Sequence, residues 1–287
     1  MFAGLIFLFS PLCWFHGTVA LTYIVETFFS ALVGYLCWQS NRGRGWYVVA
    51  SAAALGVAMG FRQSTILFLG PLWLLSLRRV RWSQAAAGLA ALALAVVAWF
   101  LPMAAQTGGV AKYFVSLWDL WSRVPGQRTV ISSTLVAGFA MLAARFCTIV
   151  VIYALCFGAA GPLAFLRRRE ASDAEKKVFT WVWIGPALVF FTFVFLNFVN
   201  SGYLLVASPP IFAWLGAGAA QWQARRKTLT FGAVAAIHAA IFLFAPLYCS
   251  YRSVRQFEAE LAGIRKSLPQ VASPNDTLIL SFDSHFL

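Results

Sequence analysis

The sequence is poor in charge, and acidic residues are the scarcest of the charged kind. Only 11% of the 287 residues are Asp, Glu, Lys or Arg, and just nine of these are acidic, whereas 61% of the residues are hydrophobic. Soluble domains carry about 25% charged residues. The deficit excludes a water-soluble globular fold, because so much apolar side chain could not be hidden from water.

Several chemical signatures are missing as well. The five cysteines form no CxxC pair and show no ligand spacing with the three histidines, so neither a zinc site nor a redox motif is indicated. The P-loop, the GxSxG nucleophile motif, the HExxH zinc motif and the GxGxxG motif do not occur. ATP-driven, serine-hydrolase and zinc-protease mechanisms therefore have no support in the sequence.

Long apolar runs dominate what is present. Each run approaches twenty residues, which is enough for a helix to cross a hydrocarbon core of roughly 30 Å. The sequence therefore predicts an all-α polytopic membrane protein with about nine helical passes or part-passes. The expected segments are 1–12, 18–39, 46–60, 63–77, 83–104, 145–166, 178–197, 203–220 and 228–248.

Short basic loops between these segments set the expected orientation. The loops at 41–45, 77–82, 167–177 and 224–227 hold 13 of the 22 basic residues. The positive-inside rule makes them cytoplasmic, and everything after Cys249 is then outside. The net charge of +13 is assigned to anionic lipid headgroups rather than to nucleic acid, because there is no basic soluble domain.

Segment 46–77 decides whether this orientation is consistent. One continuous helix there would place the two flanking basic loops on opposite sides, whereas two helices keep both inside. Residues 60–63 combine glycine with polar residues and are the expected break. Each arm would be about 21–24 Å long, so the turn at Arg62 should lie below the outer surface.

The outer segments are expected to differ from the membrane core. Residues 112–121 mix aromatic residues with Lys112 and Asp119, as is typical of a helix lying in the membrane interface. The predicted domains are a membrane domain, 1–248, and the start of an extracytoplasmic soluble domain, 249–287, with a strand-like run at 277–282. Both ends look truncated, so we expect a piece of a longer polypeptide that lacks a first span and its outer loop.

Glu26 is the only acidic residue inside an apolar segment. An intramembrane carboxylate indicates a functional site, because burying it costs a few kcal/mol. Thr18, Thr22, Glu26 and Ser30 recur every four residues and would form one polar helix face. The alternative is a structural carboxylate, satisfied by these hydroxyls or by an arginine.

Arg62 is the expected counter-charge for Glu26, since the sunken turn would bring it to a similar depth. Its guanidinium could pair with Glu26 or bind a phosphate with two hydrogen bonds. Gln63 and Tyr23 would be neighbours able to contact sugar or phosphate oxygens. His16 lies at the outer end and is a weaker catalytic candidate, because a lone interfacial histidine is more often structural.

Several degenerate apolar motifs follow one another along the chain. They are 11–17 (PLCWFHG) running into 20–26 (ALTYIVE), 56–60 with 61–64 (FRQS), 68–72 (FLGPL), 202–205 (GYLL) with Pro209 and Pro210, and 275–287. These motifs, in this order, resemble the core of the GT-C membrane glycosyltransferases, with 275–287 as a first outer strand. The nearest branch would be the protein O-mannosyltransferase and aminoarabinose transferase type. The resemblance covers most of the chain.

The resemblance implies a transferase in the bacterial inner membrane, with its active site facing the periplasm or exterior. The donor would be a polyprenyl-phosphate-linked sugar, the acceptor a glycan, lipid or protein, and a divalent cation is an allowed cofactor. Glu26 matches the second acidic position and is the catalytic candidate within this chain. The main catalytic acid is expected before Met1, so this chain alone should be inactive. Thr22, Tyr23, Arg62, Gln63 and Tyr203 would contact substrate, with Gly202 standing where a basic residue is usual.

Two other classes of function remain open at the level of sequence. A flippase or transporter of a lipid-linked substrate would need a polar path through the inner half of the membrane or inverted repeats of broken helices. The inner portions 31–36 and 72–77 are apolar, which favours the enzyme. A non-catalytic membrane assembly subunit is the third reading.

Overall fold

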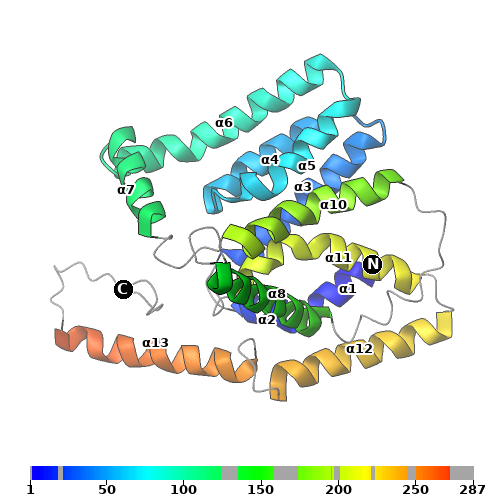
Figure 1. Cartoon of the computed structure of the whole chain (residues 1–287), viewed down its shortest axis with the longest axis vertical. Coiled ribbons are helices and arrows are strands. Elements are labelled where there is room, and N and C mark those ends of the chain that lie inside the picture. The colour runs from blue at the N-terminus through cyan, green and yellow to red at the C-terminus, as the bar shows by residue number, and fades with distance from the viewer. Residues whose placement is uncertain are drawn as a thin grey trace.

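The computed structural model describes residues 2–18, 22–123, 135–157, 174–194, 196, 201–220, 224–244 and 250–271. All regular secondary structure within these ranges is helical, as the composition predicts (Figure 1). In chain order the elements are α1 (Phe2–Leu8), α2 (Pro11–Thr18), α3 (Tyr23–Asn41), α4 (Tyr47–Phe61), α5 (Thr65–Ser76), η1 (Leu77–Arg79), α6 (Trp82–Gln106), α7 (Val110–Arg123), α8 (Leu135–Phe157), α10 (Ala174–Val189), η4 (Phe190–Val194), η5 (Ser201–Ala207), α11 (Ser208–Ala220), α12 (Ala224–Phe244) and α13 (Tyr251–Val271).

Three stretches in the described part of the chain are helical, long and apolar enough to cross a membrane. They are Trp82–Gln106, Val136–Ala154 and Ala174–Val194, and few of their side chains are buried against the rest of the protein. Their outward apolar surface suits a lipid environment. The expected total of about nine passes stays a prediction.

The helices are arranged roughly side by side. In Figure 1, α6, α4, α5, α3 and α10 run in a similar direction, α12 lies beyond α8 and α2, and α7 turns across one end of α6. Helix α4 packs chiefly against α6 and α3, while α5 packs against α10. Segments far apart in sequence therefore meet in the middle of the bundle.

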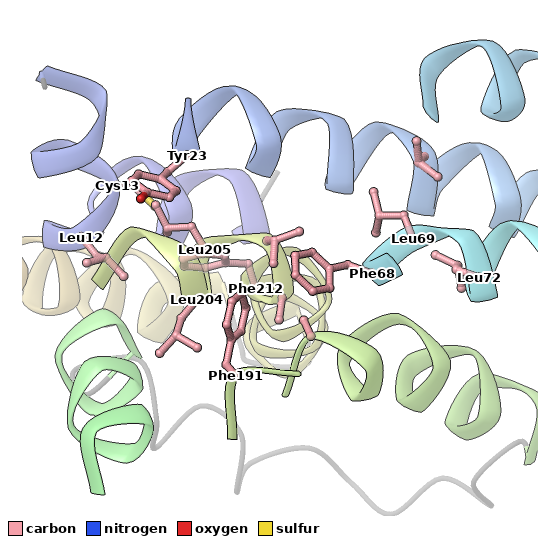
Figure 2. Packing of buried hydrophobic residues seen from close by; sticks show 14 of the residues in the cluster. Leu12, Cys13, Tyr23, Phe68, Leu69, Leu72, Phe191, Leu204, Leu205 and Phe212 are labelled. Atoms are coloured by element: carbon pink, nitrogen blue, oxygen red, sulfur yellow. The ribbon is translucent and has the colours of Figure 1, made fainter. Parts of the chain in front are cut away.

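The buried core lies where η5 enters the bundle. Leu204 and Leu205 are fully buried, with Phe191 of η4, Phe68 of α5 and Phe212 of α11 around them (Figure 2). Tyr23 and Cys13 border the same cluster at the junction of α2 and α3. This core fixes the position of η5, the element that carries Tyr203.

The two ends of the bundle differ in chemistry. The turns α3–α4 and η1–α6, together with the starts of α10 and α12, lie at one end, which we call the basic end (right in Figure 1). The break between α4 and α5 lies at the opposite end. The expected division of 46–77 into two helices is confirmed, since α4 ends at Phe61 and α5 begins at Thr65.

Three expected boundaries are wrong. Segment 1–12 is interrupted after Leu8, and a new helix begins at Pro11, where the missing N–H of proline costs no hydrogen bond. Segment 18–39 is not one helix, because α2 ends at Thr18 and α3 begins at Tyr23. Helix α8 already includes the ten residues before the expected start at 145, so Arg145 lies inside the helix instead of at its start, and the expected end at 166 lies outside the described residues.

A helix, α7, forms where an interfacial helix was expected, and its place at the interface stays a prediction. The chain after Ser250 continues as α13, a charged helix with apolar residues along one side. Residues 272–287, with the strand expected at 277–282, lie outside the described part. So do most of the basic loop 167–177 and the turn 197–200. The soluble outer domain stays a prediction.

Candidate functional site

Glu26 and Arg62 form an ion pair between α3 and the α4–α5 turn. Arg62 Nη1 donates to Glu26 Oε2 at 3.2 Å, and Thr65 Oγ1 donates to Glu26 Oε1 at 3.0 Å. The Glu26 side chain is 2% exposed and that of Arg62 is 19% exposed. Both carboxylate oxygens are thus engaged, while part of the guanidinium stays accessible.

Two neighbouring tyrosine rings pack against the Arg62 guanidinium. Its Cζ lies 4.7 Å from the ring centroid of Tyr23 and 4.5 Å from that of Tyr203. The two rings meet edge to face, with centroids 5.2 Å apart. Cation–π attraction of this kind is strongest where water is excluded. Residues 23, 26, 62 and 203, separate in sequence, therefore converge as expected.

The backbone explains why Arg62 reaches this position. Its N–H still bonds to the carbonyl of Ala58, which closes α4, but its φ of −154° and ψ of 110° are extended. The carbonyl of Arg62 then accepts from the N–H of Thr65, where α5 begins. This short turn projects the arginine side chain toward α3 and leaves Thr65 beside Glu26.

Gln63 contacts the amphipathic helix α7 rather than Glu26. Its Nε2 donates to Tyr113 Oη, and the Tyr113 ring packs edge-on against Phe100 of α6. Tyr113 is nearly buried, while Phe114, Val115 and Trp118 on the same helix are exposed. Helix α7 is therefore tied to the residue next to Arg62 and presents an apolar surface outward.

His16 and Gly202 complete the site on the side away from Glu26. The His16 ring is buried and meets the Tyr23 ring edge to face at 5.3 Å. A Cβ on Gly202 would overlap the Tyr23 ring and come within 2.7 Å of His16 Cε1. A larger side chain cannot occupy position 202 without moving both rings, so glycine at this position lets the rings come together.

The polar stripe expected on one helix does not form as predicted. Thr18 ends α2 and bonds to the carbonyl of Phe15, and Thr22 precedes α3 with an exposed side chain that makes no capping bond. The end of α2 at Thr18 separates Thr18 from the α3 residues, whereas Thr22 stays in register with Glu26, because its carbonyl accepts from the Glu26 N–H at 2.9 Å. The expected substrate contact of Thr22 stays a prediction.

Ser30 continues the buried polar line of α3 for one further turn. Its hydroxyl donates to the carbonyl of Val206 at 2.6 Å and accepts from Trp183 Nε1 at 3.0 Å. The Trp183 indole also fills the space that a side chain at Gly34 would need. These bonds fix η5 and α10 to α3, and thereby fix Tyr203 over Arg62.

Two contributors were missed by sequence reasoning. Thr65 holds Glu26, and the only available signal was its place three residues after Arg62. Arg145 of α8 is buried, and its Nη1 donates to the carbonyl of Thr192 in η4, a π-helical turn, at 3.2 Å. The π turn leaves backbone carbonyls without their α-helical partners, which gives a buried guanidinium an acceptor. The neighbouring Phe191 lies 5.8 Å from the Tyr203 ring.

The allowed divalent cation finds no suitable ligands in the described ranges. No group of three or more His, Cys, Asp or Glu side chains is gathered there. Glu26, the acidic residue of the site, has its oxygens bonded to Arg62 and Thr65, and a guanidinium beside it repels a cation. We therefore derive no step through a metal ion.

Comparison with known proteins gives no identification, since no protein-family model, curated protein or solved structure matches the chain.

Proposed function

We propose that the chain is part of a membrane glycosyltransferase that uses a polyprenyl-phosphate-linked sugar donor. The acceptor would be a glycan, lipid or protein at the end of the bundle where Arg62 lies. The proposal follows the resemblance of the motifs and is supported by one observation above all. A buried glutamate and two tyrosine rings hold a partly accessible guanidinium in place.

Such a guanidinium suits the departing phosphate. In the proposed reaction the acceptor hydroxyl oxygen attacks C1 of the sugar, and the bond from C1 to the phosphate oxygen breaks. The products are the glycoside and polyprenyl phosphate, which takes up the proton of the hydroxyl. Charge grows on the phosphate as it leaves, and a preorganised arginine stabilises that charge without reorientation. Arg62 would be the catalytic residue of this step, and Glu26, bonded to it, a positioning residue.

Aromatic and apolar side chains lie around the cation. Tyr203 and Tyr23 present ring faces to Arg62. Helix α7, tied to Gln63, lies beside the turn with exposed apolar side chains. A donor whose phosphate bonds to Arg62 would have lipid-facing surface close by for its polyprenyl chain.

A transport function is less well supported by the same contacts. A polar path along α3 would run from Glu26 past Ser30 and Gly34 toward Asn41. Trp183 occupies the position beside Gly34, and Ser30 is engaged by Val206 and Trp183. The polar line is therefore filled by side chains in the middle of the bundle.

The test uses membranes that hold the native polypeptide, with polyprenyl-phosphate-linked mannose or aminoarabinose labelled in the sugar. It measures how fast the label leaves the donor. Arg62→Gln should slow transfer at least about a hundredfold, the scale seen when one oxyanion-stabilising donor is removed. Arg62→Lys should give a smaller defect, because lysine keeps the charge but not the two-pronged hydrogen bond.

Arg79→Gln is the matched control, since it removes the same charge at the basic end. It should transfer within about twofold of wild type, because surface ion pairs contribute little. If Arg62→Gln transfers sugar as fast as wild type, Arg62 takes no part in the reaction. A native polypeptide that consumes neither donor would reject the proposed activity.

A further inference from the structure

The basic end of the bundle gathers five arginines on two neighbouring turns. Arg42 and Arg44 follow α3, while Arg78, Arg79 and Arg81 lie between α5 and α6, and all five side chains are exposed. The turns touch, since Arg79 Nη1 donates to the carbonyl of Asn41 at 3.4 Å. The Gln84 side chain also lies against Gly45, where a Cβ would clash with it.

Within the described ranges, little negative charge offsets this cluster. Arg79 pairs with Glu175 of α10 at 2.8 Å. Arg42, Arg44, Arg78 and Arg81 form no ion pair with any residue that the structure describes. Their charges are therefore available to a ligand.

Two helix N-termini add to the positive potential. Helices α4 and α6 pack alongside each other, and both begin at these turns (Figure 1). Neither has an acidic residue in its first turn. The positive ends of both helix dipoles thus point toward the arginines, which favours an anion at this place.

Exposed tryptophans beside the arginines favour a lipid ligand over a soluble anion. Trp46 is 66% exposed and Trp82 is 91% exposed, and each lies directly at the start of its helix beside the turns. Indole rings favour the depth of lipid headgroups. Farther along α6, Leu89 and Leu94 are exposed as well, as expected of a surface against acyl chains. A soluble anion would use the arginines but not this apolar surface.

We propose that Arg42, Arg44, Arg78 and Arg81 bind the phosphodiester headgroup of an anionic phospholipid, with Trp46 and Trp82 beside its acyl chains. Guanidinium groups match phosphate oxygens in geometry as well as charge. The site lies at the opposite end from Arg62 and does not depend on the proposed transfer reaction.

The experiment measures phosphatidylglycerol retained by the purified protein after reconstitution in mixed phosphatidylcholine and phosphatidylglycerol vesicles and extraction in mild detergent. Wild type should retain phosphatidylglycerol in preference to phosphatidylcholine. Replacing all four arginines by glutamine should reduce phosphatidylglycerol retention at least about tenfold, because each basic residue near the surface contributes to anionic lipid binding.

The matched control removes four charges from α13, as Arg252→Gln, Arg255→Gln, Arg265→Gln and Lys266→Gln, and should retain phosphatidylglycerol like wild type. Replacing Arg42, Arg44, Arg78 and Arg81 by lysine keeps the loop charge that orients the chain, and should retain an intermediate amount. That variant decides the matter where the glutamine variant fails to fold.

Three results would overturn the proposal. The first is that the glutamine variant retains as much phosphatidylglycerol as the α13 control. If the glutamine variant does not fold, the same comparison is made with the lysine variant. The second is equal retention of the two phospholipids by wild type. The third is displacement of the lipid by millimolar inorganic phosphate, which would assign the arginines to a soluble anion.

Discussion

Glu26 and Arg62 must be considered together, because each would be costly alone. A carboxylate that is 2% exposed has little water around it, and its charge is compensated by one guanidinium and one hydroxyl. Buried ion pairs contribute modestly to stability as a pair, but the loss of one partner leaves a buried charge uncompensated. The stability of variants at these two positions therefore reports on burial of the pair as well as on its function.

A double-mutant cycle on thermal stability in detergent measures this coupling. Arg62→Gln alone should cost about 3–5 kcal/mol, because Glu26 is left charged and buried. Glu26→Gln should cost less than this, because the more exposed Arg62 keeps its two tyrosine rings. The double variant should regain most of the loss, with a coupling energy of at least about 2 kcal/mol.

The exposed pair Arg79 and Glu175 is the control for that cycle. Its side chains are 57% and 37% exposed, so the same replacements should couple by about 0–1 kcal/mol. Additive losses for Glu26 and Arg62 would show that the pair does not compensate in solution. Equal coupling in both pairs would show that burial is not the cause.

Individual site residues could be predicted where a residue type is rare in its surroundings. Glu26 and Arg62 stand out because apolar segments seldom hold charges, and their contact follows from the break between α4 and α5. The separation of Thr18 from α3 was not predicted, because no proline follows Thr18 to mark the end of α2. Thr65 was missed because a threonine at a helix start is common.

At the scale of elements, a polar contact and ring packing connect α7 to the rest of the described structure. The helix packs against the bundle through Tyr113 and Phe114 on Phe100, and Gln63 donates to Tyr113 Oη. The rest of its apolar residues are largely exposed. The hydrogen bond therefore connects an interfacial helix to the turn that carries Arg62.

Tyr113→Phe should loosen α7 while keeping its ring packing. Loss of a buried hydrogen bond costs about 1 kcal/mol, so amide hydrogen exchange across α7 should quicken about fivefold. Trp118→Phe changes an exposed aromatic residue on the same helix and should leave exchange unchanged. Unaltered exchange in Tyr113→Phe would show that Gln63 does not hold the helix.

Arg145 shows why element boundaries were harder to predict than element types. A hydropathy pattern treats an arginine as the end of a membrane segment, because an isolated charge in hydrocarbon is costly. In α8 the guanidinium donates to the carbonyl of Thr192, which the π turn of η4 makes available. That acceptor comes from a residue 47 positions away, so no local pattern could reveal it.

At the scale of the whole molecule, composition and loop charge predicted more than any motif. The helical class follows from apolar run length, and the meeting of the basic turns at one end follows from an even number of helices between them. The order in which helices pack did not follow from sequence. It depends on contacts such as Trp183 on Gly34 and Tyr23 on Gly202, where a glycine admits a ring from a distant helix.

The last prediction concerns which end of the bundle faces outward. Helix α6 has 25 residues and is thus about 37 Å long, more than the roughly 30 Å of a hydrocarbon core, so its two ends should lie on opposite sides. In a variant with all five native cysteines replaced by alanine, Ser122→Cys beyond α6 should react with a membrane-impermeant maleimide added to intact cells. Ser83→Cys at the basic end should react only after permeabilisation.

Ser267→Cys in α13 extends the same measurement to the chain after Cys249, which is expected outside. It should therefore react like Ser122→Cys, because α12 begins at the basic end and α13 follows it (Figure 1). If Ser267→Cys is labelled only after permeabilisation, as Ser83→Cys should be, the tail lies inside. The prediction of an outer soluble domain would then be wrong. Ser83→Cys and Ser122→Cys reacting from one side would mean that α6 does not cross the membrane. Labelling of Ser83→Cys alone would put Arg62 on the cytoplasmic side, where the proposed transfer to an exterior acceptor could not occur.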